Sequence, residues 1–471
     1  MSDLLVMKFG GTSMGSADRI RVAAQILIEQ HAKRPVLAVV SAMTKVTDLL
    51  LDTMRHAEAG DVAGLEHNIS TLRIRHHETC TQLLGQDYAP PIIRALDELI
   101  NDFERIVRGM LMLGERPPRS VDEAVAIGER LSALLISSYL NRQCVQAEAL
   151  NSSLVIVTDA VFGNATPLME PTRKRAAEHI APLFEKRILP VMTGFNGATA
   201  DGRPTTLGRG GSDFSASIIA AALDAAELWI WTDVDGIMSA DPRLVRNTRV
   251  LEEVTYAEAA ELAYNGAKVL HPRTLAPLIE KKIPVWSKNS FALDKVGTKI
   301  VPVASSAPGP RAVTSMSNVA LVSLESDSAE LSGTRLMART LDSLARTNAE
   351  VLVMTSSSYR QNFCFLIRQD ELRRVTEHLE ADLALELAHG YIRPIEVDRN
   401  VGLLAIVGEG MRGTAGLAGR VFTSISKENI NIIAIAQGSS ELTIAVVVRR
   451  DGLEAAVRAV HEECGLGSPS H

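Results

Sequence analysis

The sequence predicts an α/β protein with a mainly parallel sheet covered by helices on both faces, followed by two copies of a smaller α/β unit. Three observations support this architecture. Apolar runs of strand length alternate with helix-period segments over residues 1–301. Residues 302–312 hold three prolines and one glycine among small residues, which is typical of a linker. Beyond the linker, short sequence matches recur 80 or 81 positions apart.

The strands expected in the first part are apolar runs bounded by turn residues. They are Leu4–Phe9, Pro35–Ala42, Leu189–Phe195, Glu227–Val234 and Ile283–Ser287. Ser16 is expected to cap a helix in which apolar side chains recur at helical spacing. Further helices are expected over Ser212–Leu223, Tyr256–Asn265 and Arg273–Lys281, and residues 45–145 read as mainly helical.

The second part contains a weak internal repeat. Gly333-Thr334 recurs as Gly413-Thr414, and Arg368 recurs as Arg449. Each copy reads strand, helix, strand, strand, helix. In the second copy the expected elements are Val401–Val407, Ala415–Lys427, Ile430–Gln437, Leu442–Val448 and Leu453–Glu462. The predicted domains are residues 1–301, 313–399 and 400–466.

Composition excludes several classes of protein. A hydrophobic fraction of 46% and a charged fraction of 22% are ordinary for a globular chain and argue against disorder. The net charge of -7, without a basic stripe, argues against a nucleic-acid partner. Four scattered cysteines show no metal-ligand spacing, so no metal site in the protein is expected. The chain has no signal peptide or apolar stretch of about 20 residues, which predicts a cytoplasmic protein without a membrane partner.

The first motif with chemical meaning is Lys8-Phe9-Gly10-Gly11-Thr12-Ser13. A strand delivers a lysine, and two glycines then let the backbone approach a bound group closely. An ammonium group beside exposed N–H groups suits phosphate oxygens. By itself, the motif is more typical of a tight turn with a surface lysine than of a phosphate site.

The second motif is Thr205-Thr206-Leu207-Gly208-Arg209-Gly210-Gly211-Ser212-Asp213. Three glycines surround an arginine and lead into a helix, whose first N–H groups favour an anion. Arg209 is suited to gripping a carboxylate with two hydrogen bonds. Asp213 lies in the first helical turn, where it either serves the helix dipole or orients Lys8 or a substrate ammonium.

Two further strings follow strand or helix ends. Thr232-Asp233-Val234-Asp235-Gly236 leaves a strand, and ligands of parallel sheets gather at such carboxyl ends. By itself, this string is more typical of a plain exit from a strand into a turn. Gly266-Ala267-Lys268-Val269-Leu270-His271-Pro272 joins two helices. Lys268 meets either a nucleotide or a helix C-terminus, whereas His271 is expected to be a structural or capping residue.

Together with Gly128-Glu129-Arg130-Leu131-Ser132, these strings resemble the aspartate kinases of the amino acid kinase family in order and spacing. The second part resembles the paired ACT ligand-binding domains of the same enzymes, most clearly at Gln437-Gly438-Ser439-Ser440-Glu441. The resemblance implies an amino acid kinase fold, a three-layer α/β/α arrangement, followed by two ACT-like βαββαβ domains. The length leaves no room for a fused homoserine dehydrogenase, so a monofunctional enzyme is expected.

The resemblance also assigns residues to roles. Lys8 and Asp213 are the catalytic pair. The positions expected to bind aspartate are Thr47, Glu129, Arg209, Gly210, Gly211 and Ser212. The positions expected to bind the nucleotide are Lys8, Phe9, Gly10, Gly11, Thr232, Asp233, Met238, Arg243, Lys268 and Val269. Met238 stands near the nucleotide, where many relatives carry tyrosine. Separately, Thr355–Arg360 departs from the pattern at Gln437–Glu441, so the first effector site is expected to be altered or missing.

The implied reaction is phosphorylation of the aspartate side chain by ATP with Mg²⁺. This is the first step toward lysine, threonine and methionine, with feedback by lysine or threonine at the ACT-like domains and a homodimer or homotetramer as the assembly. Two alternatives remain open at this point. One is a related kinase with another acceptor, such as acetylglutamate, and the other is an inactive amino-acid sensor. The intact Lys8 loop argues against the sensor.

Overall fold

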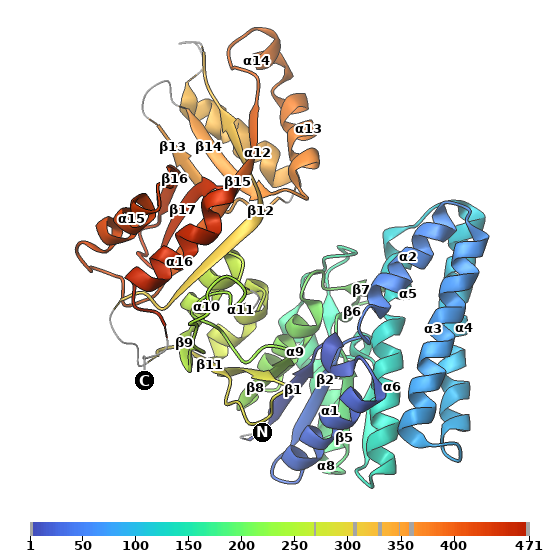
Figure 1. Cartoon of the computed structure of the whole chain (residues 1–471). Coiled ribbons are helices and arrows are strands. Elements are labelled where there is room, and N and C mark those ends of the chain that lie inside the picture. The colour runs from blue at the N-terminus through green and yellow to red at the C-terminus, as the bar shows by residue number, and fades with distance from the viewer. Residues whose placement is uncertain are drawn as a thin grey trace. The chain divides into compact units, whose positions relative to one another are not determined.

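The computed structural model describes residues 3–267, 270–304, 309–327, 332–347, 349–357 and 362–467 (Figure 1). The chain forms two compact units. The first comprises Met1–Gly236, Glu252–Tyr256 and Leu270–Ala304, and the second comprises Ile237–Leu251, Ala257–Val269 and Ser305–His471. Within the described part of the chain, no helix is long and apolar enough to cross a membrane.

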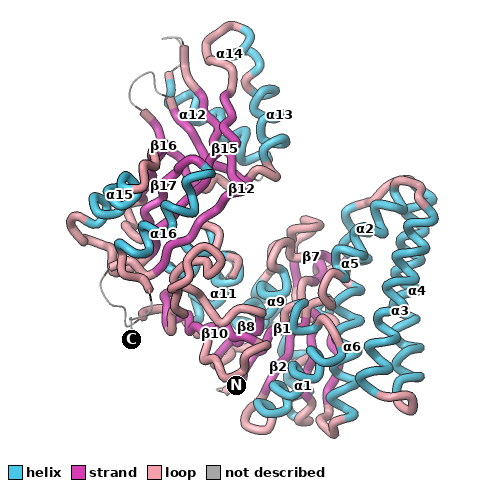
Figure 2. The backbone as a smooth tube through the Cα atoms, in the orientation of Figure 1, coloured by secondary structure: helices cyan, strands magenta, loops and turns pink. Residues whose placement is uncertain are grey.

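The first unit is built on an eight-stranded sheet (Figure 2). Its order is β3 (Ala147–Leu150), β5 (Leu189–Thr193), β2 (Val36–Val40), β1 (Leu5–Phe9), β8 (Glu227–Thr232), β10 (Val285–Asn289), β11 (Thr298–Val301) and β9 (Glu253–Thr255). Every neighbouring pair is parallel except β10 with β11. The central strands β1, β2 and β5 are buried along their whole length, as expected for a parallel sheet covered on both faces.

Helices cover both faces of this sheet. Leu5, Met7 and Phe9 of β1 share a core with α1 (Ala17–His31) and α6 (Ile127–Arg142). Alternate residues of a strand point to opposite faces, so Lys8 points to the side where α9 (Gly211–Ala222) packs. The remaining helices of this unit are α2 (Val46–Glu58), α3 (Val62–Leu84), α4 (Ala89–Leu113), α5 (Pro118–Val125), α7 (Met169–His179), α8 (Ala181–Glu185) and α11 (Pro272–Lys281).

Local signals account for several element boundaries. The Ser16 side chain accepts a hydrogen bond from the Arg19 N–H, which confirms the expected cap of α1. His271 caps α11 by accepting from the Arg273 N–H, as expected for a capping histidine. A short sheet of β4 (Val157–Thr158), β6 (Asn196–Thr199) and β7 (Pro204–Thr206) lies beside the second glycine motif.

The second unit holds a six-stranded antiparallel sheet that confirms the internal repeat. Its order is β13 (Val353–Ser356), β14 (Phe363–Arg368), β12 (Ala312–Leu324), β15 (Glu396–Val407), β17 (Thr443–Arg449) and β16 (Ile432–Gln437). The order is symmetric about the β12–β15 pair. The first copy carries α12 (Gly333–Thr347), α13 (Leu372–Asp382) and α14 (Ala384–Ala388), and the second carries α15 (Leu417–Lys427) and α16 (Leu453–Glu463). The α/β class and the two ACT-like units are thus confirmed.

Two segments that precede the linker pack with the second unit. Ala240 and Val245 share a core with the helices α15 and α16, and the Val313 N–H donates to the Ser239 carbonyl at 2.8 Å. Helix α10 (Tyr256–Tyr264) leads from the first unit into the second. The domain boundary predicted at residue 301 divides the chain at one point. In the structure, these two segments precede that point but belong to the second unit.

Candidate active site

The site begins with an ion pair at the carboxyl end of β1. The Lys8 Nζ lies 2.5 Å from Oδ1 of Asp213, in the first turn of α9. Both side chains are largely shielded from solvent, with exposed fractions of 11% and 19%. A partly buried pair of this kind fixes the position of the ammonium group while leaving its remaining donors available.

The loop after β1 is compact because its glycines lie against neighbouring strand ends. The Gly10 N–H donates to the Trp231 carbonyl at the end of β8. A Cβ at Gly11 would approach the Ala42 carbonyl oxygen to 3.1 Å. The loop then forms a single 3-10 turn, Gly11–Met14, in which Ser13 hydrogen-bonds Ser290 at 2.8 Å. The ends of β1, β2, β8 and β10 therefore meet at one edge of the sheet.

The second glycine loop ends at the start of α9. Gly208 and Gly210 have φ angles of 75° and 70°, which side chains rarely adopt. The Gly210 position is also crowded, because a Cβ there would lie 3.1 Å from the His271 Cβ. These two glycines turn the chain so that the first N–H groups of α9 face outward from the helix end, where they favour an anion.

Asp122 holds the start of this loop in place. Its buried carboxylate accepts hydrogen bonds from the Gly163 N–H at 2.8 Å, the Thr206 N–H at 2.9 Å and the Thr206 hydroxyl at 2.8 Å. Burial raises the pKa of Asp122 above its ordinary value, and the hydrogen bonds from the three donors only partly offset this effect. Sequence reasoning missed this residue, because a single acid in a helix-period segment carries no local signal.

Glu129 is a buried carboxylate with spare bonding capacity. Its Oε1 accepts from the Ala42 N–H at 3.2 Å, while Oε2 has no partner among the described residues. Burial raises the pKa of Glu129 to about 8, although the hydrogen bond from Ala42 and the charge of Lys8 lower it. A buried acid without a full set of partners is a good receptor for a cationic group.

The other expected substrate positions lie on the same unit. Arg209 is exposed, and its guanidinium forms no hydrogen bond or ion pair with the rest of the described chain. Thr47 lies half-buried in the first turn of α2. Ser212 packs closely against the loop after β5, since a Cβ at Gly194 would lie 2.8 Å from the Ser212 Cβ.

The expected nucleotide positions divide between the units. Thr232 ends β8 and its carbonyl accepts from the Ser290 N–H, while Asp233 is exposed beside it. Met238 and Arg243 belong to the second unit, where the exposed Arg243 pairs with Asp241 at 2.5 Å. Lys268 and Val269 lie outside the described residues.

Comparison with known proteins places these features in a family. The family model of the amino acid kinase family matches residues 3–289, and that of the ACT domain matches residues 404–464. The bifunctional aspartokinase/homoserine dehydrogenase 1 of Arabidopsis thaliana is 35% identical over 466 residues, which are 97% of this chain and 50% of that protein. The chain thus spans about half the length of the curated relatives that it matches first.

Two other similar proteins correspond over almost their full length. The lysine-sensitive aspartokinase 3 of Escherichia coli is 31% identical over 98% of this chain and 99% of its own. The crystal structure of E. coli aspartokinase III in complex with aspartate and ADP has a TM-score of 0.84 at 29% identity, over 98% of this chain and 99% of that one. The match of the family model over residues 3–289 and the nearly full-length similarity to aspartokinase 3 show that the chain belongs to the amino acid kinase family and, within it, to the ACT-containing aspartokinases.

Proposed function

We propose that the chain is an ATP-dependent aspartate kinase that forms 4-phospho-L-aspartate. The observation that carries this proposal is the arrangement around Lys8. The Lys8–Asp213 pair lies between two glycine loops, and the unsatisfied Oε2 of Glu129 is buried on the same unit. A phosphate site beside a receptor for an ammonium group fits a phosphorylated amino acid. The relatives named above support aspartate as that amino acid.

The proposed reaction requires the protein to position the aspartate carboxylate against ATP and to neutralise the charge of the phosphates. The side-chain carboxylate of aspartate has an ordinary pKa of about 3.9, so it is already a nucleophile at pH 7. Its oxygen forms a bond to the γ-phosphorus as the bond from that phosphorus to the bridging oxygen of ADP breaks. Lys8 neutralises charge on the phosphates, and the N–H groups of both loops add donors. Asp213 orients Lys8 and has no proton to remove from the acceptor.

Different expected residues bind the different parts of the two substrates. Glu129 receives the ammonium of aspartate, Arg209 its α-carboxylate, and Thr47 with Gly210–Ser212 complete the site. The nucleotide lies along Lys8–Gly11 and is expected to reach the positions given by the resemblance, which are Thr232, Asp233, Met238, Arg243, Lys268 and Val269.

Mg²⁺ fits this site as an ion carried by the nucleotide. Proteins usually bind it through one or two carboxylates together with substrate phosphates. Among the described residues, no three His, Cys, Asp or Glu side chains group as a metal site. Asp213 lies against the Lys8 ammonium and would be available to such an ion, which would supply further charge neutralisation there.

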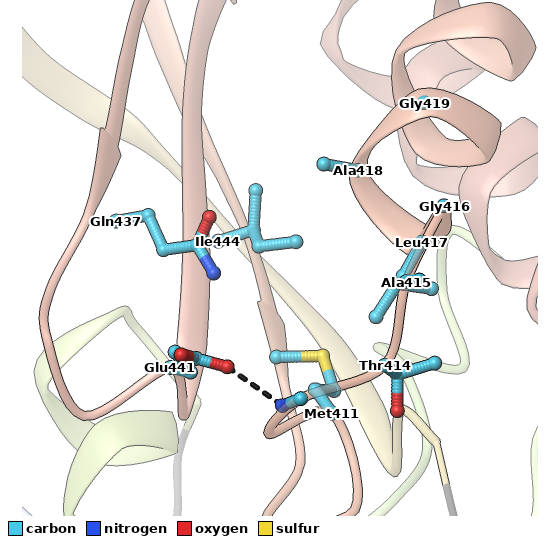
Figure 3. Close-up of a pocket in the computed structure, with 11 residues that line it drawn as sticks. Met411, Thr414, Ala415, Gly416, Leu417, Ala418, Gly419, Gln437, Glu441 and Ile444 are labelled. Atoms are coloured by element: carbon cyan, nitrogen blue, oxygen red, sulfur yellow. Dashed lines mark hydrogen bonds between the residues drawn. The ribbon is translucent and has the colours of Figure 1, made fainter.

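We also propose an effector pocket in the second ACT-like domain. A cavity of about 330 Å³ lies between the Gly-rich start of α15, Gln437 at the end of β16 and Glu441 in the loop before β17 (Figure 3). Glu441 faces this cavity and accepts from the Gly413 N–H at 2.7 Å. The helix start suits a carboxylate and Glu441 suits an ammonium group, so lysine or threonine is the proposed ligand. The E. coli relative is named as lysine-sensitive, which supports lysine.

The first ACT-like domain has a comparable cavity with a different lining. It has 360 Å³ and is lined by Thr355, Ser356 and Ser357, beside the ion pair of Glu325 with Arg393. The altered sequence at residues 355–357 therefore changes the chemistry of this pocket, and residues 358–360 of the pattern lie outside the described residues. Paired ACT-like units support a homodimer or homotetramer, which size-exclusion chromatography with light scattering would test.

An ADP-release assay over several acceptors tests the proposed reaction. L-Aspartate should give turnover, and hydroxylamine should trap the acyl phosphate. Preference for acetylglutamate would favour the related kinase, and no ATP turnover with any acceptor would favour the sensor. Calorimetry with lysine and threonine tests the effector. An absence of binding heat at millimolar concentrations would contradict it.

A further inference from the structure

The segment from Ile237 to Leu251 carries two of the expected nucleotide positions, Met238 and Arg243. Its two arms are tied together, because Met238 bridges to Val250 and the Leu251 N–H donates to the Ile237 carbonyl at 2.8 Å. The segment is therefore a closed loop with a defined shape. Its position depends on what holds it within the second unit.

Ser239 is the point at which this loop is held. It is fully buried, its N–H donates to the Arg249 carbonyl at 2.9 Å, and its carbonyl accepts from the Val313 N–H of β12. Its hydroxyl accepts from the Arg249 N–H at 3.1 Å and lies 3.0 Å from the His461 Nε2 of α16. A hydroxyl that accepts one hydrogen bond still has a proton to donate, so all polar groups of Ser239 are used.

His461 is the partner from the ACT-like part of the unit. It lies in the last turn of α16 with an exposed fraction of 3%. Burial and the charge of Arg249 lower the pKa of His461, so the ring is neutral at pH 7 and its Nε2 can accept from Ser239. Apolar neighbours reinforce the contact, because Ala240 and Val245 share a core with Val457 and Val460 of the same helix.

The loop thus has one face in the core and another toward solvent. Ala240 and Val245 are buried, whereas the Arg243 side chain is 73% exposed and is steadied by Asp241. A buried polar contact in a packed core fixes one position of its backbone. Any shift at Ser239 would move Met238 directly and Arg243 four residues on.

We propose that His461 is a positioning residue for the nucleotide, acting through Ser239 on the loop that carries Met238 and Arg243. This inference rests on the proposed function, because it takes ATP as the ligand of that loop. It assigns to the last helix of the ACT-like part a role in the affinity for ATP and none in binding aspartate.

The test compares His461→Leu, His461→Gln and Ser239→Ala in the full chain, with separate KM values for ATP and aspartate. His461→Leu should raise the KM for ATP about fivefold, as expected for the loss of one hydrogen bond, and change kcat and the KM for aspartate less than about twofold. His461→Gln places an amide near Nε2 and should restore most of the affinity. Ser239→Ala should raise the KM for ATP at least as much as His461→Leu, because it also removes the acceptor of the Arg249 N–H, and the two combined should be less than additive.

The matched control is His378→Leu, because His378 is exposed on α13 and bonds only within its own helix in the described structure. It should leave all three constants unchanged. An unchanged KM for ATP in both His461→Leu and Ser239→Ala would overturn the inference. So would equal losses in both KM values, or failure of His461→Gln to rescue, because either result indicates a general folding role. An unsubstituted chain without aspartate-dependent turnover would instead contradict the proposed function.

Discussion

At the residue scale, the Lys8–Asp213 pair is the most direct target. Lys8→Met removes the ammonium while keeping the length of the side chain. If Lys8 neutralises charge as the phosphoryl group moves, kcat should fall by about a hundredfold or more, with a smaller change in the KM for aspartate. Steady-state ADP release measures both constants.

The exposed Lys33 offers the matched control, and Lys33→Met should keep full activity. A Lys8→Met variant within threefold of normal turnover would remove Lys8 from the transition state. Asp213→Asn tests the other partner. Because Asp213 is assigned an orienting role, its loss should lower kcat, and full turnover in Asp213→Asn would contradict that role.

The raised pKa of Glu129 predicts a pH-dependent affinity for aspartate. Below its pKa of about 8 the empty site holds a protonated acid, and an incoming ammonium favours the carboxylate. Binding therefore releases a proton, and affinity should rise with pH between about 6 and 8, by at most about tenfold per unit. Calorimetry in buffers of different ionisation enthalpy measures both the affinity and the proton.

Glu129→Gln is the control for this effect, because the amide cannot titrate. The variant should bind aspartate weakly and with little dependence on pH over the same range. A normal protein whose affinity for aspartate is flat from pH 6 to 8 would contradict the assignment of Glu129 as the ammonium receptor.

The residues of the site differ in how far sequence could predict them. Lys8, Arg209 and Asp213 stand in glycine-rich strings with a recognisable chemical logic, so they could be identified before any fold was known. Asp122 could not, because its role depends on Gly163 and Thr206, which lie far from it in sequence. Only the folded chain brings these donors to one carboxylate.

At the scale of elements, Gly210 determines how α9 begins. Gly210→Ala would force a side chain to φ 70° and place its Cβ 3.1 Å from His271. The left-handed conformation alone costs about 1–2 kcal/mol. The variant should therefore lose about that much unfolding free energy and show a raised KM for aspartate, as measured by chemical denaturation and steady-state kinetics.

Gly109→Ala provides a control that is expected to change the free energy of unfolding in the opposite direction. Gly109 lies inside α4 with open space around it, so alanine there should stabilise the protein by about 0.5–1 kcal/mol and leave kinetics unchanged. A Gly210→Ala variant as stable and active as the Gly109→Ala variant would show that the turn tolerates a side chain.

Most of the expected elements lie within two residues of the observed ones, but β15 begins at Glu396 and not at the expected Val401. The strand expected at Glu227–Val234 ends at Thr232, and the helix expected at Ser212–Leu223 spans Gly211–Ala222. These differences of one or two residues arise where strand ends turn into loops. Hydrophobic period identifies an element, whereas hydrogen bonds to neighbouring segments decide where it stops.

At the scale of the whole molecule, residues that precede the predicted linker pack in one core with residues that follow it. A fragment ending at residue 304 would keep the segment Ile237–Leu251 but lose the core in which Ala240 and Val245 lie. We expect this fragment to aggregate, and coexpression with residues 305–471 to restore a soluble complex. A monodisperse fragment with kinase activity, as judged by light scattering and ADP release, would contradict the expectation.

The packing of this segment with the part of the chain after the linker could not be predicted from composition or hydrophobic periodicity. The segment after Gly236 reads as an ordinary continuation of the first part, and the prolines near residue 302 are the clearest break in the chain. The contact of Ser239 with His461 joins residues 222 positions apart. A local pattern carries no information about a partner at that distance.

The pairing of β1 with β8 has a consequence for synthesis of the protein. Leu5 pairs with Glu227, whereas its other neighbour, Val36, follows closely in the chain. At about 5–20 residues per second, β1 waits roughly ten to forty seconds on the ribosome for its second partner. During that interval one edge of a strand that is buried along its whole length in the finished fold lacks its hydrogen-bonding partner. The newly made N-terminal half therefore needs shielding from other chains before the Lys8 loop can take its final form.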